Sequence, residues 1–323
     1  MMPTPTRLRA VMGQRYDTGL LANGAVPVPG FDIEYVDAGK VPGALFREGL
    51  RGEFDICEQA FSHYLIARDQ GLELTAVPVF PSHLFPHYTI FVHRDSDIFE
   101  PTELIGRRVA LPDFGYNPAV WARGMLQEQY RVPIERIEWV ESARRPLLGD
   151  LQPNRAARFQ VIPHPAGHGN FAQGLYGFAD AIAQREIDAI ILPRKPADAD
   201  HSLRPLLTSP YAEALRYAES TGAVPINTVL TLTNDAVRRH PDLPGVLLSA
   251  CGNALERFAG GLTDPEHSGW HQDLDMRQLQ TDRLFPWRYG VSANRRVIET
   301  MLRYCREQGV IRRHIPVEDL FAA

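Results

Sequence analysis

Short apolar runs alternate along the chain with segments in which apolar residues recur every three or four positions. Short runs of aliphatic, β-branched and aromatic residues are typical of buried strands, and the amphipathic segments are typical of covering helices. Their alternation favours an α/β fold with largely parallel sheets. The runs that we interpret as strands are LRAVM (8–12), FDIEYVDA (31–38), FDICE (54–58), LTAVPVF (74–80), TIFVH (89–93), RRVALP (107–112), IEWVE (137–141), DAIIL (188–192) and TVLTLT (228–233).

Two distant stretches follow the same pattern. FREGLRGEFDICE (46–58) and AIAQREIDAIIL (181–192) each lead from a helical pattern, through an arginine-glutamate turn and an aspartate, into a buried strand. This echo predicts two lobes built on similar units. The chain is expected to cross between them near residues 81–94 and 222–232, so that lobe 1 comprises residues 1–85 and 229–323 and lobe 2 comprises residues 86–228.

Beyond residue 235 the pattern becomes helical. Near the end of the chain, ANRRVIETMLRYCREQGV (293–310) carries apolar residues at the i, i+3, i+4, i+7 spacing of one buried stripe. Gly309 is a suitable stop, because glycine readily adopts the left-handed conformation that ends many helices. The stripe is formed by Ile298, Met301, Leu302 and Cys305.

Composition narrows the class of protein. The 323 residues are 44% hydrophobic and 23% charged, and the net charge is −5, which is ordinary for a globular chain of about two domains. A mildly acidic chain without basic blocks predicts neither a nucleic acid nor a membrane as partner, so a small molecule is the better expectation. Whether the chain forms a homo-oligomer is left open.

The cysteines and the N-terminal segment indicate the cellular compartment in which the protein is expected. Three cysteines, each within an apolar pattern, can form neither a disulfide framework nor a CxxC metal site, which favours a reducing environment. The only apolar run before Gly13 and Gln14 is Ala10-Val11-Met12, too short for a signal peptide, and no other stretch could span a bilayer. We therefore expect a cytoplasmic protein.

The clearest candidate for a ligand-binding motif is LPDFGYNPAVWARGML (111–126). A strand ending at Leu111 is followed by a glycine-containing loop, and then by Asn117 as an expected helix N-cap with proline at the first helical position. The free N–H groups of this helix start would suit a carboxylate. Tyr116 and Trp121 could add aromatic surface and Arg123 a cation. In the alternative interpretation, Trp121 belongs to the core and Arg123 is solvated.

Glu58 is a second candidate. It is expected at the carboxyl end of a strand, just before a helix that opens near Ala60, where a side chain can act on a ligand. The alternative is that it stabilises the start of that helix with its charge. Its neighbour Cys57 is expected to be a small buried hydrophobe.

The histidines do not make a convincing metal site. His83 and His87, like His267 and His271, have H-x3-H spacing, but Pro86 makes the first pair non-helical and neither pair has the HExxH glutamate. GHGNFAQG (167–174) lacks the third glycine of a dinucleotide fingerprint and follows the proline-broken VIPHPAG. It is interpreted as a loop from which His168 could reach a ligand.

Several longer stretches, in order, resemble one family over nearly the whole chain: GEFDICEQAFSHYL, VPVFPSHLFPHYTIFV, GRRVALPDFGYNPAVWARGMLQEQY, IEWVE and YGVSANRRVIETMLRYCREQGV with VEDLF. The chain is similar to the 4,5-dihydroxyphthalate decarboxylase family. The resemblance implies the two-lobed fold of the type 2 periplasmic binding proteins, with a ligand cleft between the lobes and a helical C-terminal segment. FPSHLFPH (80–87) would then be the crossover that lines the cleft.

The chain departs from the family pattern at some of these positions. It reads Phe85-Pro86-His87 where the family tends to read Phe-Arg-His, and His83 stands where an arginine is common. It also reads Pro225-Ile226-Asn227-Thr228 where the family tends to read Pro-Ile-Met-His. Fewer cationic groups would face the ligand, which leaves open whether the substrate is a phthalate dianion.

The resemblance implies decarboxylation of a hydroxylated aromatic acid without an organic cofactor, a divalent metal being left open. His87 is assigned as proton donor, Glu58 as acceptor from a ring hydroxyl, and Arg123, with the helix start at Asn117, as carboxylate clamp. The other expected ligand contacts are Gln59, Ser62, Phe85, Tyr116, Trp121, His168, Arg194 and Asn227. Two rival interpretations are a non-catalytic binding protein for a small organic acid and a related lyase such as a chorismate dehydratase.

Overall fold

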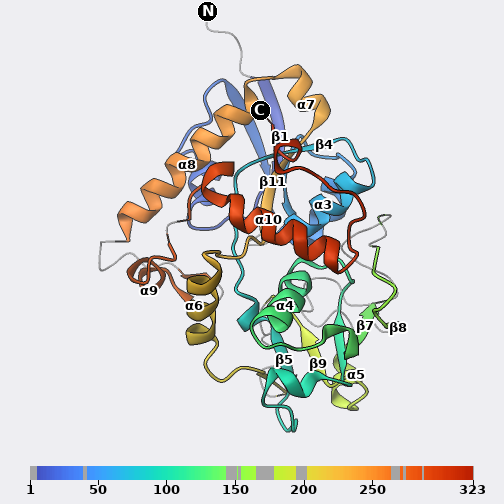
Figure 1. The fold of residues 1–323 in the computed structure, drawn as a ribbon. Helices are drawn as coiled ribbons and strands as arrows, with labels where there is room; N and C mark the ends of the chain where they lie inside the picture. Colours follow the sequence, from blue (N-terminus) through green and yellow to red (C-terminus); the bar gives the residue numbers. More distant parts are fainter. Residues whose placement is uncertain are drawn as a thin grey trace, which may run out of the picture. The chain divides into compact units, whose positions relative to one another are not determined.

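The computed structural model describes residues 6–38, 42–142, 151, 154–164, 178–193, 202–262, 270–271, 274–285 and 287–322. Its contacts divide the chain into two compact units: unit 1 is Met1–His83, Ile226–Arg295 and Ile315–Ala323, and unit 2 is Leu84–Pro225 and Arg296–His314 (Figure 1). The first two crossings lie within a few residues of the boundaries expected after residues 85 and 228. Residues 296–314, which we expected in lobe 1, group with unit 2.

Unit 1 contains a five-stranded sheet in the order β2-β1-β3-β11-β4. β1 pairs in parallel with β2 and β3, whereas β11 runs antiparallel between β3 and β4. Every residue of β3 is buried, as expected for a strand with both faces covered. The strands are β1 (Thr6–Val11), β2 (Phe31–Val36), β3 (Ile56–Ala60), β4 (Leu74–Val77) and β11 (Thr228–Thr233).

Helices cover this sheet. The long helix α8 packs Leu247 and Ala254 into the same core cluster as Leu8 of β1 and Leu230 of β11, and Figure 1 shows it in orange beside β1. The helical elements of this unit are α1 (Thr18–Ala22), η1 (Pro42–Leu45), α2 (Phe46–Leu50), α3 (Phe61–Asp69), α7 (Asn234–Arg239), α8 (Leu243–Gly261), α9 (Met276–Thr281) and η7 (Val317–Asp319). A small antiparallel pair joins β12 (Trp270–His271) to β13 (Leu274–Asp275).

Unit 2 contains a six-stranded sheet in the order β10-β5-β9-β6-β7-β8. β9, β6, β7 and β8 are parallel neighbours, and β5 runs antiparallel between β10 and β9. The strands are β5 (Ile90–His93), β6 (Arg108–Leu111), β7 (Glu138–Ser142), β8 (Val161–His164), β9 (Ala189–Ile191) and β10 (Leu203–Pro205).

The helical elements of unit 2 include α4, which contacts β9 of the sheet. α10 carries the expected stripe, since Ile298, Met301 and Cys305 have no exposed surface. Gly309 follows it with φ +74°, and a Cβ there would lie 2.2 Å from the Ala156 backbone nitrogen, so this position requires glycine. The elements are η2 (Pro86–Tyr88), η3 (Pro101–Leu104), α4 (Asn117–Glu128), η4 (Ile134–Arg136), α5 (Ala179–Ala183), α6 (Pro210–Thr221) and α10 (Val291–Glu307), of which residues from Arg296 belong to unit 2.

The two sheets repeat one arrangement, as the echo in the sequence predicted. Strand β3, reached from α2, lies between β1 and the antiparallel β11, and strand β9, reached from α5, lies between β6 and the antiparallel β5. β5 and β11 are the strands that follow the first two crossings. The prediction of largely parallel sheets is therefore right except at β11 and β5, each of which runs antiparallel to both of its neighbours.

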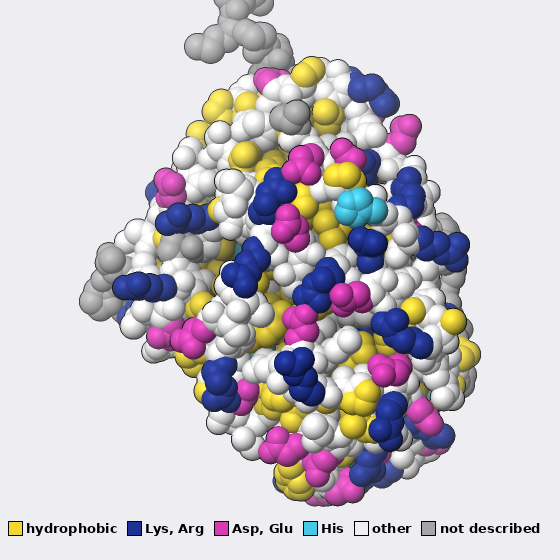
Figure 2. All heavy atoms as spheres, viewed as in Figure 1, with side chains coloured by type: hydrophobic (Ala, Val, Ile, Leu, Met, Phe, Trp, Pro, Cys, Tyr) yellow, Lys and Arg dark blue, Asp and Glu magenta, His cyan; other side chains and the backbone are white. Residues whose placement is uncertain are grey.

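Two further findings concern the expected class of protein. Cys57, Cys251 and Cys305 are all buried, as predicted, and none of the three forms a disulfide. No helix in the described part of the chain has the length and apolar character needed to cross a membrane. On the face seen in Figure 2, basic and acidic side chains are interspersed.

Candidate active site

Glu58 lies in β3 of unit 1 and is completely buried. Its Oε1 accepts hydrogen bonds from Arg15 Nη2 at 2.8 Å and Thr228 Oγ1 at 2.7 Å. Its Oε2 accepts from the Gly13 backbone N–H at 2.9 Å and from Arg15 Nη2 at 2.8 Å. The strand was expected to end at Glu58, but it continues to Ala60, so Glu58 is a strand residue and does not cap α3. Both carboxylate oxygens already carry two hydrogen bonds.

Arg15, the partner of Glu58, follows β1 on the strand's carboxyl side. Burial alone would lower the pKa of Arg15, but the negative charges of Glu58 and Asp17 raise it above its usual value, so the guanidinium stays charged. Its side chain keeps 9% of its surface exposed. It also lines a pocket of about 450 Å³ together with Gln14, Tyr16 and other residues of unit 1.

An aromatic cluster lies beside this ion pair. The indole of Trp287 donates to the Tyr16 hydroxyl at 3.3 Å and stacks on the ring of His83, with centroids 4.4 Å apart. The Tyr289 hydroxyl donates to Asp17 at 2.8 Å, and burial raises the pKa of that carboxyl. The loop that carries Arg15 is thus held by the segment around Trp287.

The other expected ligand contacts of unit 1 lie close to Glu58 in the chain or in the sheet. Gln59 donates to the Phe46 carbonyl at 2.9 Å and is buried, as is Ser62. Asn227 is half-buried. Its backbone carbonyl accepts a hydrogen bond from the Phe61 N–H, and its backbone N–H donates to the Ser82 carbonyl at 2.8 Å.

His87 lies in η2 of unit 2, with 1% of its surface exposed. Its Nε2 is 2.8 Å from Gln129 Oε1, and its ring meets that of Tyr217 edge-on at 5.6 Å. Burial lowers the pKa of His87 to about 4; the Gln129 contact partly opposes this shift and the charge of Arg216 adds to it. The unliganded protein therefore carries His87 as the neutral imidazole at pH 7.

Arg123 of α4 is completely buried, so the alternative that it is solvated is wrong. Its guanidinium lies 4.0 Å from the centre of the Phe114 ring, donates to the Phe114 carbonyl at 2.6 Å and to Gln308 Oε1 at 2.7 Å. Burial lowers its pKa to about 9. These contacts tie the loop before α4 to the residue that follows α10.

The start of α4 differs by one residue from the prediction. Tyr116 is the N-cap, Asn117 is the first helical residue, and proline stands second. Tyr116, Asn117, Trp121 and Phe85 are all buried. Trp121 meets the Tyr304 ring edge-on at 5.6 Å, which matches the alternative that it belongs to the core.

Several predicted positions lie outside the described residues or lack a described side chain. His168, Arg194 and His267 are among the former, and His271 is described by its backbone only. The prolines of VIPHPAG argue against a strand, but Val161–His164 form β8. Its proline is tolerated because β8 is at the sheet edge. Within the described ranges, no three His, Cys, Asp or Glu side chains gather as metal ligands would.

The arrangement of two units with mixed sheets is that of the periplasmic binding proteins, as predicted. The aliphatic sulphonate binding protein SsuA of Escherichia coli superposes with a TM-score of 0.56 at 14% identity, over 99% of this chain and 98% of that one. A crystal structure described as the desulfurization enzyme DSZB superposes with a TM-score of 0.52 at 16% identity, over 98% and 96%. These likenesses establish the fold.

Sequence comparison adds closer relatives. The chain is 28% identical over 311 residues to a 4,5-dihydroxyphthalate decarboxylase of Comamonas testosteroni, which covers 93% of this chain and 92% of that protein. It is 29% identical over 184 residues to a protein of the same name from Pseudomonas putida, covering 55% and 66%. No protein-family model matches the chain. The resemblance found in the sequence is thereby confirmed.

Sequence reasoning missed Arg15, Gln129 and Glu213, which contact the predicted residues directly or through one neighbour. The available signal for Arg15 was its position in GQRYD, a polar loop directly after the first strand, where parallel sheets bind ligands. Gln129 and Glu213 carry no local signal, because they reach His87 only through the packing of α4 and α6 against η2, the element that carries His87.

Proposed function

We propose that this protein is a decarboxylase of a hydroxylated aromatic carboxylic acid related to 4,5-dihydroxyphthalate. The observation that carries the proposal is the 28% identity to a 4,5-dihydroxyphthalate decarboxylase along 93% of this chain. Since the match extends over 92% of that relative, it includes both units and not a shared subdomain alone.

The chemistry requires one proton and one departing carbon dioxide. A ring hydroxyl ortho or para to the carboxylate donates electrons, so that a proton can add to the carboxyl-bearing carbon. The bond to the carboxylate then breaks, its electron pair restores the aromatic ring, and carbon dioxide leaves. The enzyme must supply the proton, hold the anion and exclude water.

His87 is the proposed proton donor. In the unliganded protein burial lowers its pKa to about 4, so it must gain its proton when substrate binds. An anionic carboxylate beside a buried imidazole raises the imidazole pKa, because the opposite charge favours the protonated form. Substrate binding would thus protonate the His87 imidazole, which then donates this proton in the reaction.

Arg15 is the proposed anion-binding group of unit 1. It is charged, lines a pocket and is oriented by Glu58, whose two oxygens accept from it. We therefore propose that Glu58 acts by positioning Arg15, since acceptance from a ring hydroxyl would displace an existing hydrogen bond. In unit 2, Arg123 is proposed to fix the loop before α4 beside an anion at the helix start.

The proposal includes a cytoplasmic location and a small-molecule partner. Its support is that none of the three cysteines forms a disulfide, a state that a reducing compartment maintains. Cell fractionation with an antibody against the native protein tests the location, and recovery in the periplasmic fraction contradicts it.

The experiment is to incubate the purified protein with a panel of hydroxylated benzoates and phthalates and to measure carbon dioxide release. For an acid that is turned over, His87→Ala should lower kcat by about 10²–10⁴-fold, the range for a lost general acid, and leave affinity within about tenfold. His93→Ala, a partly buried histidine of β5, is the matched control and should keep the parental kcat. Equal losses in both variants would remove His87 from the mechanism.

A further inference from the structure

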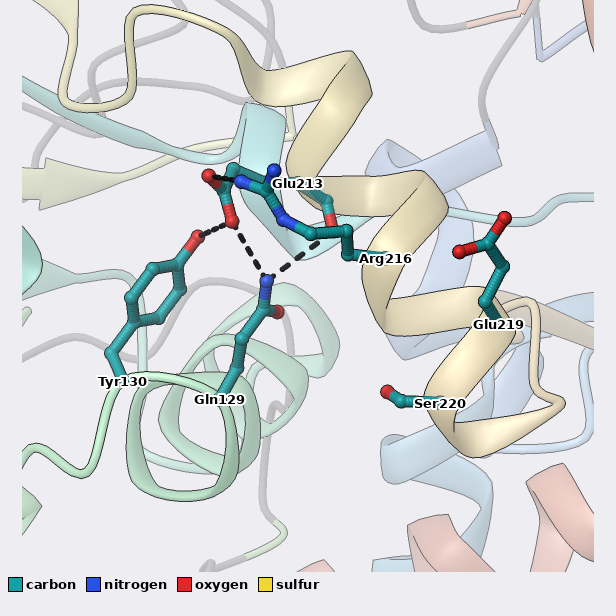
Figure 3. Close-up of a pocket in the computed structure, with 6 residues that line it drawn as sticks. All are labelled: Gln129, Tyr130, Glu213, Arg216, Glu219 and Ser220. Atoms are coloured by element: carbon teal, nitrogen blue, oxygen red, sulfur yellow. Dashed lines mark hydrogen bonds and ion pairs between the residues drawn. The ribbon is translucent and has the colours of Figure 1, made fainter.

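A chain of hydrogen bonds leads from His87 to the surface of unit 2. His87 Nε2 contacts Gln129 Oε1 at 2.8 Å, and Gln129 Nε2 donates to Glu213 Oε2 at 2.9 Å and to the Glu213 backbone carbonyl at 3.3 Å. Tyr130 donates its hydroxyl to Glu213 Oε2 at 3.0 Å, and Arg216 pairs with the other oxygen. Figure 3 shows Gln129 and Tyr130 pointing toward Glu213 from the end of α4.

The chemistry of these groups fixes the direction of every bond in the chain. An ionised carboxylate and a backbone carbonyl only accept hydrogen bonds, so the amide of Gln129 must turn its NH₂ toward Glu213. Its carbonyl oxygen is then the atom that faces His87. A carbonyl oxygen also only accepts, and His87 must therefore donate from Nε2. In the neutral imidazole the other nitrogen, Nδ1, is then a bare acceptor.

We propose that Glu213 and Gln129 hold His87 in the Nε2–H tautomer, so that Nδ1 is the atom that takes up and delivers the proton in catalysis. The catalytic half of this inference rests on the proposed decarboxylase function. His87 comes from η2, Gln129 from the end of α4 and Glu213 from α6, so the fold itself aligns the three side chains. Among the described residues Nδ1 has no hydrogen-bond partner.

The surroundings of the chain support a positioning role. His87 is almost completely buried, whereas Glu213 keeps 20% of its side chain exposed and lines a pocket of about 660 Å³ with Arg216 and Ser220. Tyr130 donates to the same carboxylate oxygen of Glu213 as Gln129, and Arg216 pairs with the other oxygen (Figure 3). A carboxylate anchored in this way can orient the amide without approaching the imidazole, so Gln129 and Glu213 are positioning residues.

The direct test is nitrogen NMR of the unliganded full chain with ¹⁵N-labelled histidine, with the His87 signals assigned by their loss in His87→Gln. We expect the shift of a protonated nitrogen at Nε2 and of an unprotonated nitrogen at Nδ1. A proton on Nδ1 would overturn the inference. Because no substrate is present, this result does not depend on whether the protein is a decarboxylase.

Two variants test the positioning role. Gln129→Leu removes the acceptor and should mix the two tautomers and lower kcat about 10- to 100-fold, while KM changes little. Glu219→Gln is the matched control, since it removes an exposed carboxylate of α6, the helix that carries Glu213. Glu219 lines the same pocket but points away from Gln129 (Figure 3), so this variant should keep the tautomer and the rate. An unchanged tautomer in Gln129→Leu contradicts the positioning role. The expected tautomer in a protein that releases no carbon dioxide from any acid overturns the catalytic half alone.

Discussion

Replacing Arg15 with methionine should destabilise unit 1 far more than the loss of an ordinary surface ion pair. The substitution keeps much of the side-chain volume but leaves Glu58, with no exposed surface, holding only the Gly13 N–H and the Thr228 hydroxyl. Removing one partner of a buried ion pair costs about 3–5 kcal/mol, because the remaining charge stays buried without compensation. We expect a loss of this size in the free energy of unfolding.

The same strand supplies a matched control. Arg7 of β1 pairs with Glu34 at 3.0 Å, but both side chains are largely exposed, at 70% and 44%. Exposed pairs contribute little, so Arg7→Met should stay within about 0.5–1 kcal/mol of the parent. Thr228→Val, which removes one hydrogen bond to the buried carboxylate, should fall between the two at about 1.5–3 kcal/mol.

The assay is urea unfolding followed by circular dichroism, extended to the double variant Glu58→Gln with Arg15→Met. Once the buried charge is absent, loss of the arginine should matter less, and the double variant should be more stable than the sum of the single losses allows, by about 0.5–3 kcal/mol. The reasoning is refuted if Arg15→Met costs no more than Arg7→Met, or if the two single losses add.

The remaining predictions concern His87, two glycines and metal. Burial lowers the pKa of His87 to about 4 from an ordinary 6.5, so the neutral imidazole contributes stability that is fully present above pH 6.5 and is lost as the pH falls toward 4. The expected loss in the free energy of unfolding is about 3 kcal/mol. This loss should disappear from the pH dependence of urea unfolding in His87→Gln. Gly124→Ala should destabilise by about 1–3 kcal/mol, because a Cβ there would lie 2.1 Å from the Tyr304 ring, whereas Gly252→Ala, with nothing within 4 Å in α8, should stabilise by up to about 1 kcal/mol in the same unfolding assay. Carbon dioxide release should survive exhaustive chelation by EDTA, and recovery of a lost rate by one divalent ion would contradict this.

The strands were predictable because each buried strand leaves a local signature. All nine apolar runs became strands, and the stripe containing Ile298 and Met301 became the buried face of α10. β8 was missed because Pro163 argues against a strand unless its place at the sheet edge is known, and that place is a property of the assembled sheet. Strand direction in β5 and β11 likewise depends on where the chain crosses between units.

The site was predictable only in part, for a related reason. Glu58 and His87 stand out locally, but the partners that define their roles are brought by packing. Arg15 lies 43 residues from Glu58, and Thr228 lies 170 residues away. They meet because β3 pairs with β1 on one side and β11 on the other. The burial that lowers the pKa of His87 also depends on packing, since local sequence does not fix solvent exposure.

The most direct test of the decarboxylase assignment combines binding and turnover of one acid. The purified protein is titrated calorimetrically with 4,5-dihydroxyphthalate and with the acid of the panel that binds most tightly, and each is then incubated in D₂O. We predict one carbon dioxide for each product molecule and one deuterium at the ring carbon that lost its carboxylate, with both signals strongly reduced in His87→Ala. Tight binding without carbon dioxide release, equal in the parent and in His87→Ala, would contradict the assignment and indicate a binding protein.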